Sequence, residues 1–154
     1  MAATDTSPAT ETTLRLTRTL QAAPKEVFRA WTEREALKSW FSPSPDFETT
    51  VHDLDVRPGG RYRVEMKSPE GEVHIVAGTY REVSPPRRLV YTWRWEGKSS
   101  LEGADTVVTL DFHARPDGGT DLVLTHENFP SATALEEHNK GWNGCLDRLT
   151  RYVA

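Results

Sequence analysis

The central part of the chain alternates between apolar and polar residues, which is the pattern of a β-strand with one buried face. In the stretch RYRVEMK, Tyr62, Val64 and Met66 share one face and the charged residues share the other. Such alternation is typical of antiparallel sheets that pack one face on a core. With the other segments of similar pattern, it predicts seven strands at 14–20, 47–54, 61–67, 73–83, 88–95, 106–113 and 120–127.

A helical period appears just after the first predicted strand and again at the end of the chain. Pro24 suits a first helical turn, and the spacing predicts a short helix through Trp31 and a second one that ends near Phe41. The last segment has one apolar face over about 20 residues, or ~30 Å. Thr133 and Glu136 form a potential capping box at its start. The apolar face consists of Leu135, His138, Trp142, Leu146, Leu149 and Val153.

Two glycines interrupt this last helix, although each costs roughly 1 kcal/mol relative to alanine inside a helix. Gly141 falls on the flank of the apolar face, and we expect it to relieve crowding where a strand or loop comes close to Trp142. Gly144 projects roughly opposite Trp142, so we expect it to face solvent and to let the helix curve.

The order of these elements indicates the fold class. Short turns join consecutive strands, and the helices are segregated toward the ends of the sequence, which favours an α+β fold with an antiparallel meander. One long C-terminal helix then crosses a curved sheet. A chain of 154 residues fits a single domain, assigned to 14–154. Residues 1–13, rich in Thr, Ala and Ser without apolar periodicity, are expected to form a disordered tail.

Composition narrows the classes of partner. The chain has 19 basic and 23 acidic residues, a net charge of -4, and no basic block, which argues against nucleic-acid binding. A single cysteine excludes an internal disulfide, and the first residues lack the features of a secretory signal. No apolar run approaches the ~20 residues that cross a bilayer. We therefore expect a cytoplasmic protein that does not insert into membranes.

Four stretches together resemble a known family: PKEVFRAWTEREALKSWFSP, LDVRPGGRYRVEM, AGTYREVSPPRRLVYTW and HNKGWNGCLDRL. The chain from Leu14 to its C-terminus resembles homologues of the activator of the heat-shock protein 90 ATPase, the AHSA-like family of the START-like or SRPBCC superfamily. The resemblance implies a helix-grip fold: a seven-stranded antiparallel sheet around a long C-terminal helix, with two short helices after the first strand. It also implies a cavity between sheet and helix that receives hydrophobic small molecules.

The aromatic residues are the most informative candidates for such a cavity. Aromatic side chains mostly fill cores, but Tyr and Trp also carry a polar group that can orient a ligand in an apolar wall. The predicted ligand-binding residues, on the inward faces of strands and helices, are Trp40, Tyr62, Val64, Met66, Tyr80, Trp93, Phe112, His126, His138 and Trp142.

Few residues suggest chemistry beyond binding. The five histidines show no metal-ligand spacing, so neither a metal nor another cofactor is expected. His126 and His138 are each expected to be hydrogen-bonded core histidines, and the alternative is a general base or polar anchor in the pocket. Glu82 could reach a pocket rim but is better explained as a solvated charge. Cys145, on the edge of the apolar face, is expected to be an ordinary buried thiol.

Three hypotheses about function follow. The first is binding of a small hydrophobic or aromatic molecule between the sheet and the last helix. The second is a cyclase or aromatase on the same scaffold, by analogy of fold. The third is a chaperone partner of the heat-shock protein 90 ATPase, for which the sequence shows no clustered apolar surface. A homodimer is compatible with exposed strand faces but is not required by them.

Overall fold

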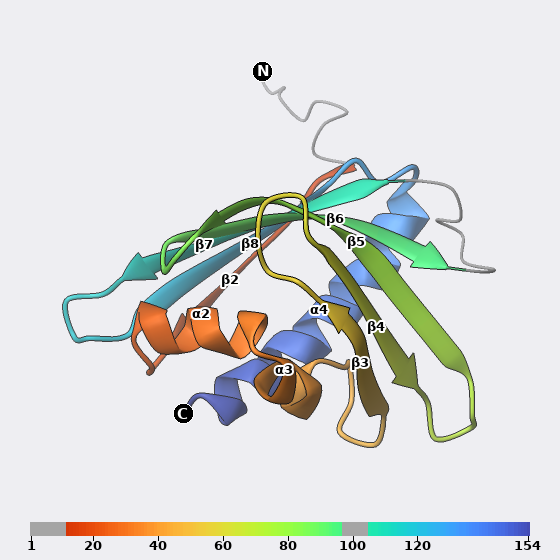
Figure 1. Ribbon diagram of the computed structural model, residues 1–154, viewed down its shortest axis with the longest axis horizontal. Coiled ribbons are helices and arrows are strands. Elements are labelled where there is room, and N and C mark those ends of the chain that lie inside the picture. Colours follow the sequence, from red (N-terminus) through yellow and green to blue (C-terminus); the bar gives the residue numbers. More distant parts are fainter. Residues whose placement is uncertain (1–11, 97–104) are drawn as a thin grey trace.

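The computed structural model describes residues 12–96 and 105–154, in which a curved antiparallel sheet holds all three helices on one side (Figure 1). The elements in chain order are β2 (Leu14–Leu20), α2 (Pro24–Thr32), α3 (Arg34–Trp40), β3 (Glu48–Leu54), β4 (Arg61–Lys67), β5 (Val73–Ser84), β6 (Arg88–Glu96), β7 (Thr106–Ala114), β8 (Thr120–Glu127) and α4 (Ala132–Tyr152). Each predicted strand and helix is present.

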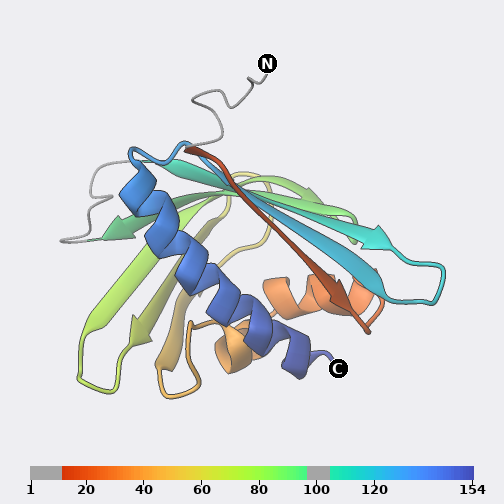
Figure 2. The same cartoon turned by 180° about the vertical axis from the view of Figure 1, so that it is seen from behind.

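The sheet has seven strands in the order β2-β8-β7-β6-β5-β4-β3, and all neighbours are antiparallel. Strands β3 to β8 form a continuous meander, and β2 joins its far edge beside β8. Register shifts between Val51 and Asp53 and between Tyr80 and Glu82 mark irregularities of the kind that bend a sheet. Helix α4 runs diagonally across the concave face (Figure 2). The predicted helix-grip fold is confirmed.

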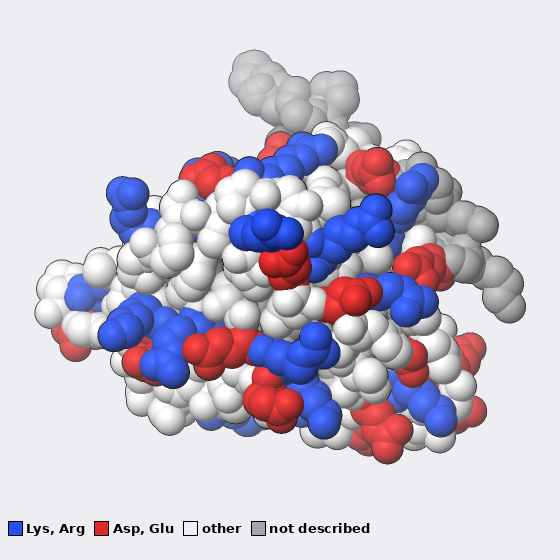
Figure 3. All heavy atoms as spheres, in the orientation of Figure 1, with Lys and Arg blue, Asp and Glu red and all other residues white. Residues whose placement is uncertain are grey.

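The strand alternation buries the expected faces. In β4, Tyr62, Val64 and Met66 are buried, and the charged residues between them are exposed or half-buried. On the outer surface, acidic and basic side chains are interspersed over the face in Figure 3. The first 11 residues of the expected disordered tail lie outside the described part of the chain. Of its remaining residues, Thr12 accepts a hydrogen bond from the Phe129 amide through its carbonyl oxygen (3.2 Å).

The start of α4 differs from the prediction. Ser131, not Thr133, caps the helix: its backbone is extended, and its hydroxyl accepts a hydrogen bond from the Ala134 amide at 3.1 Å. Thr133 lies within the first turn and is exposed. Serine and threonine are both favourable N-cap residues. The sequence therefore did not show whether the helix begins after Ser131 or after Thr133.

The two helix glycines also have roles opposite to those expected. A Cβ atom at Gly144 would collide with the backbone carbonyl of Pro43, in the connection from α3 to β3. Gly144 therefore permits a close approach between α4 and that connection and does not face open solvent. A Cβ at Gly141 would meet nothing within 4 Å, so Gly141 relieves no crowding.

Hydrogen bonds from side chains near Gly144 hold the C-terminal half of α4 in place. The Arg148 guanidinium donates to the Ser42 hydroxyl and, at 3.1 Å, to the Ser39 carbonyl oxygen at the end of α3. From the other side, Arg18 of β2 donates to the Asn143 side-chain oxygen at 2.7 Å. The C-terminal half of α4 is thus held between α3 and the edge strand β2.

The glycine environments predict opposite effects of the same substitution. Gly141→Ala should raise the free energy of unfolding by about 0.5–1 kcal/mol, because alanine favours the helix and meets no obstacle. Gly144→Ala should lower it by about 1–3 kcal/mol, because the methyl group forces α4 away from Pro43. Urea unfolding monitored by circular dichroism measures both. Equal effects of the two substitutions would contradict the close approach at Gly144.

Candidate functional site

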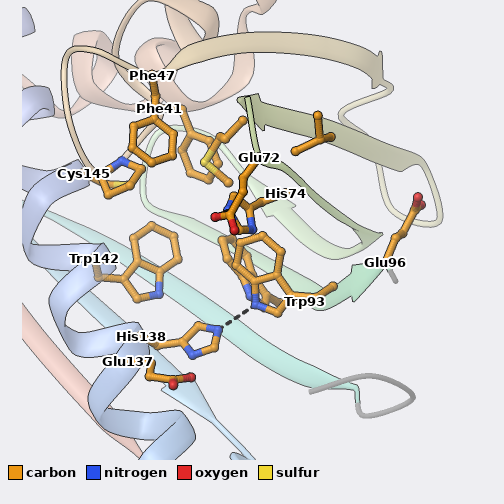
Figure 4. Close-up of a pocket in the computed structure, with 15 residues that line it drawn as sticks. Phe41, Phe47, Glu72, His74, Trp93, Glu96, Glu137, His138, Trp142 and Cys145 are labelled. Atoms are coloured by element: carbon orange, nitrogen blue, oxygen red, sulfur yellow. Dashed lines mark hydrogen bonds and ion pairs between the residues drawn. The ribbon is translucent and has the colours of Figure 1, made fainter. Parts of the chain in front are cut away.

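A cavity of about 760 Å³ opens between α4 and the strands β4, β5 and β6 (Figure 4). The connection from α3 to β3 closes one side of it. Aromatic and aliphatic side chains form most of its wall, with a few polar groups among them. The lining residues are Phe41, Pro43, Phe47, Met66, Glu72, Val73, His74, Trp93, Trp95, Glu96, Glu137, His138, Gly141, Trp142 and Cys145.

The cavity lies beside the N-terminal half of α4, where the helix is connected to the sheet by side chains. Trp95 of β6 donates its indole N–H to His138 Nε2 at 2.8 Å, as the dashed line in Figure 4 marks. The other ring nitrogen, His138 Nδ1, lies 2.8 Å from the Ala134 carbonyl oxygen. A carbonyl only accepts, so Nδ1 carries the proton and Nε2 is the acceptor. His138 is therefore a neutral imidazole with both nitrogens engaged.

A second indole–imidazole pair lies deeper. Trp142 of α4 donates its indole N–H to His126 Nδ1 at 3.0 Å. His126 Nε2 lies 2.7 Å from the Thr106 hydroxyl, which itself donates to the Trp93 carbonyl oxygen at 2.9 Å. The Thr106 oxygen must therefore accept from Nε2, which fixes the opposite tautomer to that of His138. His126 is fully buried and neutral, and both its nitrogens are satisfied.

Burial sets the protonation of the titratable groups in this region. It lowers the pKa of His126 well below its ordinary value, and the neighbouring His138 lowers it further. Burial also lowers the pKa of His138, against smaller opposite effects from the Ala134 carbonyl and Glu137. The Cys145 thiol has its pKa raised to about 12 by burial, so it stays protonated and is a poor nucleophile at neutral pH.

The structure divides the predicted ligand-binding residues into three groups. Four line the large cavity: Met66, Trp93, His138 and Trp142. Three surround a separate cavity of about 20 Å³, with room for roughly one water molecule: Tyr62, Val64 and Tyr80. The remaining three line neither: Trp40, Phe112 and His126.

The third group has clear structural roles. Trp40 donates its indole N–H to the Ala30 carbonyl oxygen at 2.9 Å and so joins α3 to α2. The ring of Phe112 packs edge-on against Phe28, with centroids 5.3 Å apart. His126 positions Trp142, which does line the cavity.

Phe41 and Trp93 line both cavities and separate them, with ring centroids 6.2 Å apart. Of the lining residues that sequence reasoning missed, Trp95 carried a usable signal, because it continues the period of two from Trp93 in β6. Glu72 lies in the β4–β5 turn, and Phe47 lies between α3 and β3. No periodic pattern identifies residues at such positions.

Residues 21–154 match the family model described as Activator of Hsp90 ATPase homolog 1-like protein. The chain belongs to this family. The predicted resemblance is therefore confirmed, and the AHSA-like domain has the START-like architecture described above. No curated protein is significantly similar to the chain.

Solved structures agree with this assignment. Protein CV1439 of Chromobacterium violaceum is 32% identical, with a TM-score of 0.82, over 92% of this chain and 97% of the other. The AHSA1 protein of Silicibacter pomeroyi is 26% identical, with a TM-score of 0.78, over 90% and 95%. Protein NE0264 of Nitrosomonas europaea is 25% identical, with a TM-score of 0.74, over 94% and 95%. These similarities extend over nearly the whole of each chain.

Within 12–96 and 105–154, no helix has the length and apolarity needed to cross a bilayer. In the same two segments, no group of three or more His, Cys, Asp or Glu side chains is arranged to hold a metal ion.

The depressed histidine pKa values predict a pH dependence of stability. Unfolded histidine takes up a proton near pH 6.5, whereas folded His126 does not, so the unfolded state binds more protons as the pH falls below that value. The free energy of unfolding should therefore fall between pH 7.5 and 5.5, by about 1 kcal/mol from His126 alone. Urea unfolding across this range measures the slope.

Two variants isolate the contribution of the buried ring. His126→Gln should be less stable at pH 7.5 but should show a flatter pH profile, because the group that titrates on unfolding is gone. His113→Gln, at an exposed position of β7, serves as the control for the loss of a histidine. A flat profile for the unmodified protein would contradict the buried neutral state of His126.

Proposed function

We propose that the protein binds a small apolar molecule with an aromatic body in the cavity between α4 and strands β4 to β6. The cavity itself carries this proposal: its volume of about 760 Å³ lies in the range of ~300–1,000 Å³ found for small-molecule sites. Its wall includes the rings of Phe41, Trp93, Trp95 and Trp142. A flat apolar guest would gain dispersion contacts with these rings.

The wall is pre-organised for such a guest. Trp95 and Trp142 are each fixed by a hydrogen bond to an imidazole, and Trp93 packs against Trp142 with ring centroids 5.0 Å apart. Side chains that are already ordered lose little conformational entropy when a ligand binds. The aromatic side chains of the wall can therefore bind a ligand without rearranging.

The two alternative functions have less support. An enzyme that uses His126 or His138 as a general base would first have to break an indole hydrogen bond, because each accepting nitrogen is already occupied. For a chaperone partner, the large hydrophobic residues exposed in the described part of the chain are Val73, at the cavity, and Tyr152, at the end of α4. These two residues belong to different elements and give no clear docking patch.

Filling the cavity tests the proposal. Gly141 lines the cavity, and a Cβ there would meet nothing within 4 Å, so Gly141→Phe should place its ring in the cavity and block binding. The neutral fluorophore N-phenyl-1-naphthylamine serves as the probe, because its emission rises in apolar surroundings. The unmodified protein should bind the probe, and Gly141→Phe should weaken binding by at least about tenfold, roughly 1.4 kcal/mol.

Gly141→Ala is the matched control, because it also replaces the glycine with a better helix former but fills little of the cavity. It should retain the affinity of the unmodified protein, and thermal unfolding should show both variants folded. Absence of probe binding by the unmodified protein, or equal binding by Gly141→Phe, would contradict the proposal.

A further inference from the structure

The cavity lining has an asymmetric charge distribution. Three carboxylates, those of Glu72, Glu96 and Glu137, belong to it, and no Lys or Arg does among the described residues. Glu96 is neutralised from outside, because the Arg63 guanidinium donates two hydrogen bonds of 3.0 Å to its carboxylate. Glu72 and Glu137 are therefore the acidic groups that are not neutralised in this way. Both are exposed and lie at the opening of the cavity, its mouth.

Neither of these two carboxylates pairs with a strong cation. The nearest partner of Glu72 is the imidazole of His74, at 3.5 Å. Glu137 makes no ion pair within residues 12–96 and 105–154. In Figure 4 the Glu72 carboxylate points toward the aromatic wall, and Glu137 lies beside His138 on α4. The mouth therefore has negative charge on both of its sides.

The interior offers little to an anion. The indole N–H groups of Trp95 and Trp142 both donate to histidines, and those histidines donate in turn to Ala134 and Thr106. Both rings are neutral in these hydrogen-bonding states. The N–H of Trp93 has no partner among the described residues, but it is itself buried. An incoming carboxylate would thus meet two like charges at the mouth, and the indole donors of Trp95 and Trp142 are already engaged.

We infer that the ligand of this cavity is an amine: an aromatic or other apolar body carrying a protonated nitrogen. The body lies in the cavity against Trp93, Trp95 and Trp142, and the ammonium group stays at the mouth between Glu72 and Glu137. Opposite charges attract across the partly solvated mouth, and tryptophan rings also attract cations. This inference depends on the proposed function and specifies the class of molecule bound.

Three naphthalenes that differ in one substituent provide the test. These are 2-naphthylmethylamine, 2-naphthalenemethanol and 2-naphthoate, which carry a positive, zero and negative charge at pH 8. Each displaces N-phenyl-1-naphthylamine from the unmodified protein at low ionic strength, where charge effects are least screened. We expect the amine to bind about tenfold more tightly than the alcohol, and the carboxylate to bind most weakly.

A double variant tests whether the two carboxylates cause the preference. Glu72→Gln with Glu137→Gln should weaken amine binding about tenfold and leave alcohol binding unchanged, because only the charge is lost. Glu70→Gln with Glu136→Gln is the matched control. It removes the same charge from the same turn and the same helix, at exposed positions that do not line the cavity. The control should bind all three compounds as the unmodified protein does.

The outcomes separate the two proposals. If the probe binds but the amine shows no advantage over the alcohol, or if 2-naphthoate binds best, the amine inference is overturned and the apolar site stands. The same holds if the two double variants behave alike. If neither the probe nor any naphthalene binds the folded, unmodified protein, the proposed function fails together with the inference.

Discussion

The structure depends on how α4 is held at a distance from the sheet. At its C-terminal half the helix touches the α3–β3 connection so closely that Gly144 has no room for a side chain, and Arg148 bonds to that connection. At its N-terminal half the links are side chains: His138 reaches Trp95, and Trp142 reaches His126. Close backbone contact at one end and long aromatic links at the other leave a cavity between them.

Those aromatic links place polar bonds inside an apolar core. Burying an unpaired polar nitrogen costs free energy, and in these two indole–imidazole pairs every nitrogen has a hydrogen-bond partner. The two histidines meet this demand with opposite tautomers, since His126 accepts at Nδ1 and His138 at Nε2. Their neutrality also keeps positive charge away from the cavity wall. The bonds that position the wall therefore contribute to the charge preference that we infer for the ligand.

Sequence periodicity predicted the fold well, because burying one face of a strand or helix imposes a regular pattern. It predicted contacts less well. A helical projection gave the directions in which Gly141 and Gly144 point, but not which residues they face. The α3–β3 connection, which contacts Gly144, has no regular pattern of apolar residues that could have placed it there. The cap at Ser131 was missed for a related reason, since serine and threonine have the same capping chemistry.

The candidate site was harder to predict because a cavity is a volume that side chains fail to fill. Tyr62 and Trp93 both face inward, yet Trp93 borders the large cavity and Tyr62 only the small one beyond Phe41. The alternation of apolar and polar residues predicts which face of the sheet a residue occupies. It does not predict which of the inward-facing residues border a cavity. The mouth residue Glu72 lies in a turn, outside any period, and Glu137 lies on α4 beside the apolar face. The groups that would select a ligand by charge thus lie where hydrophobic patterning carries least information, and only the folded arrangement brings them together.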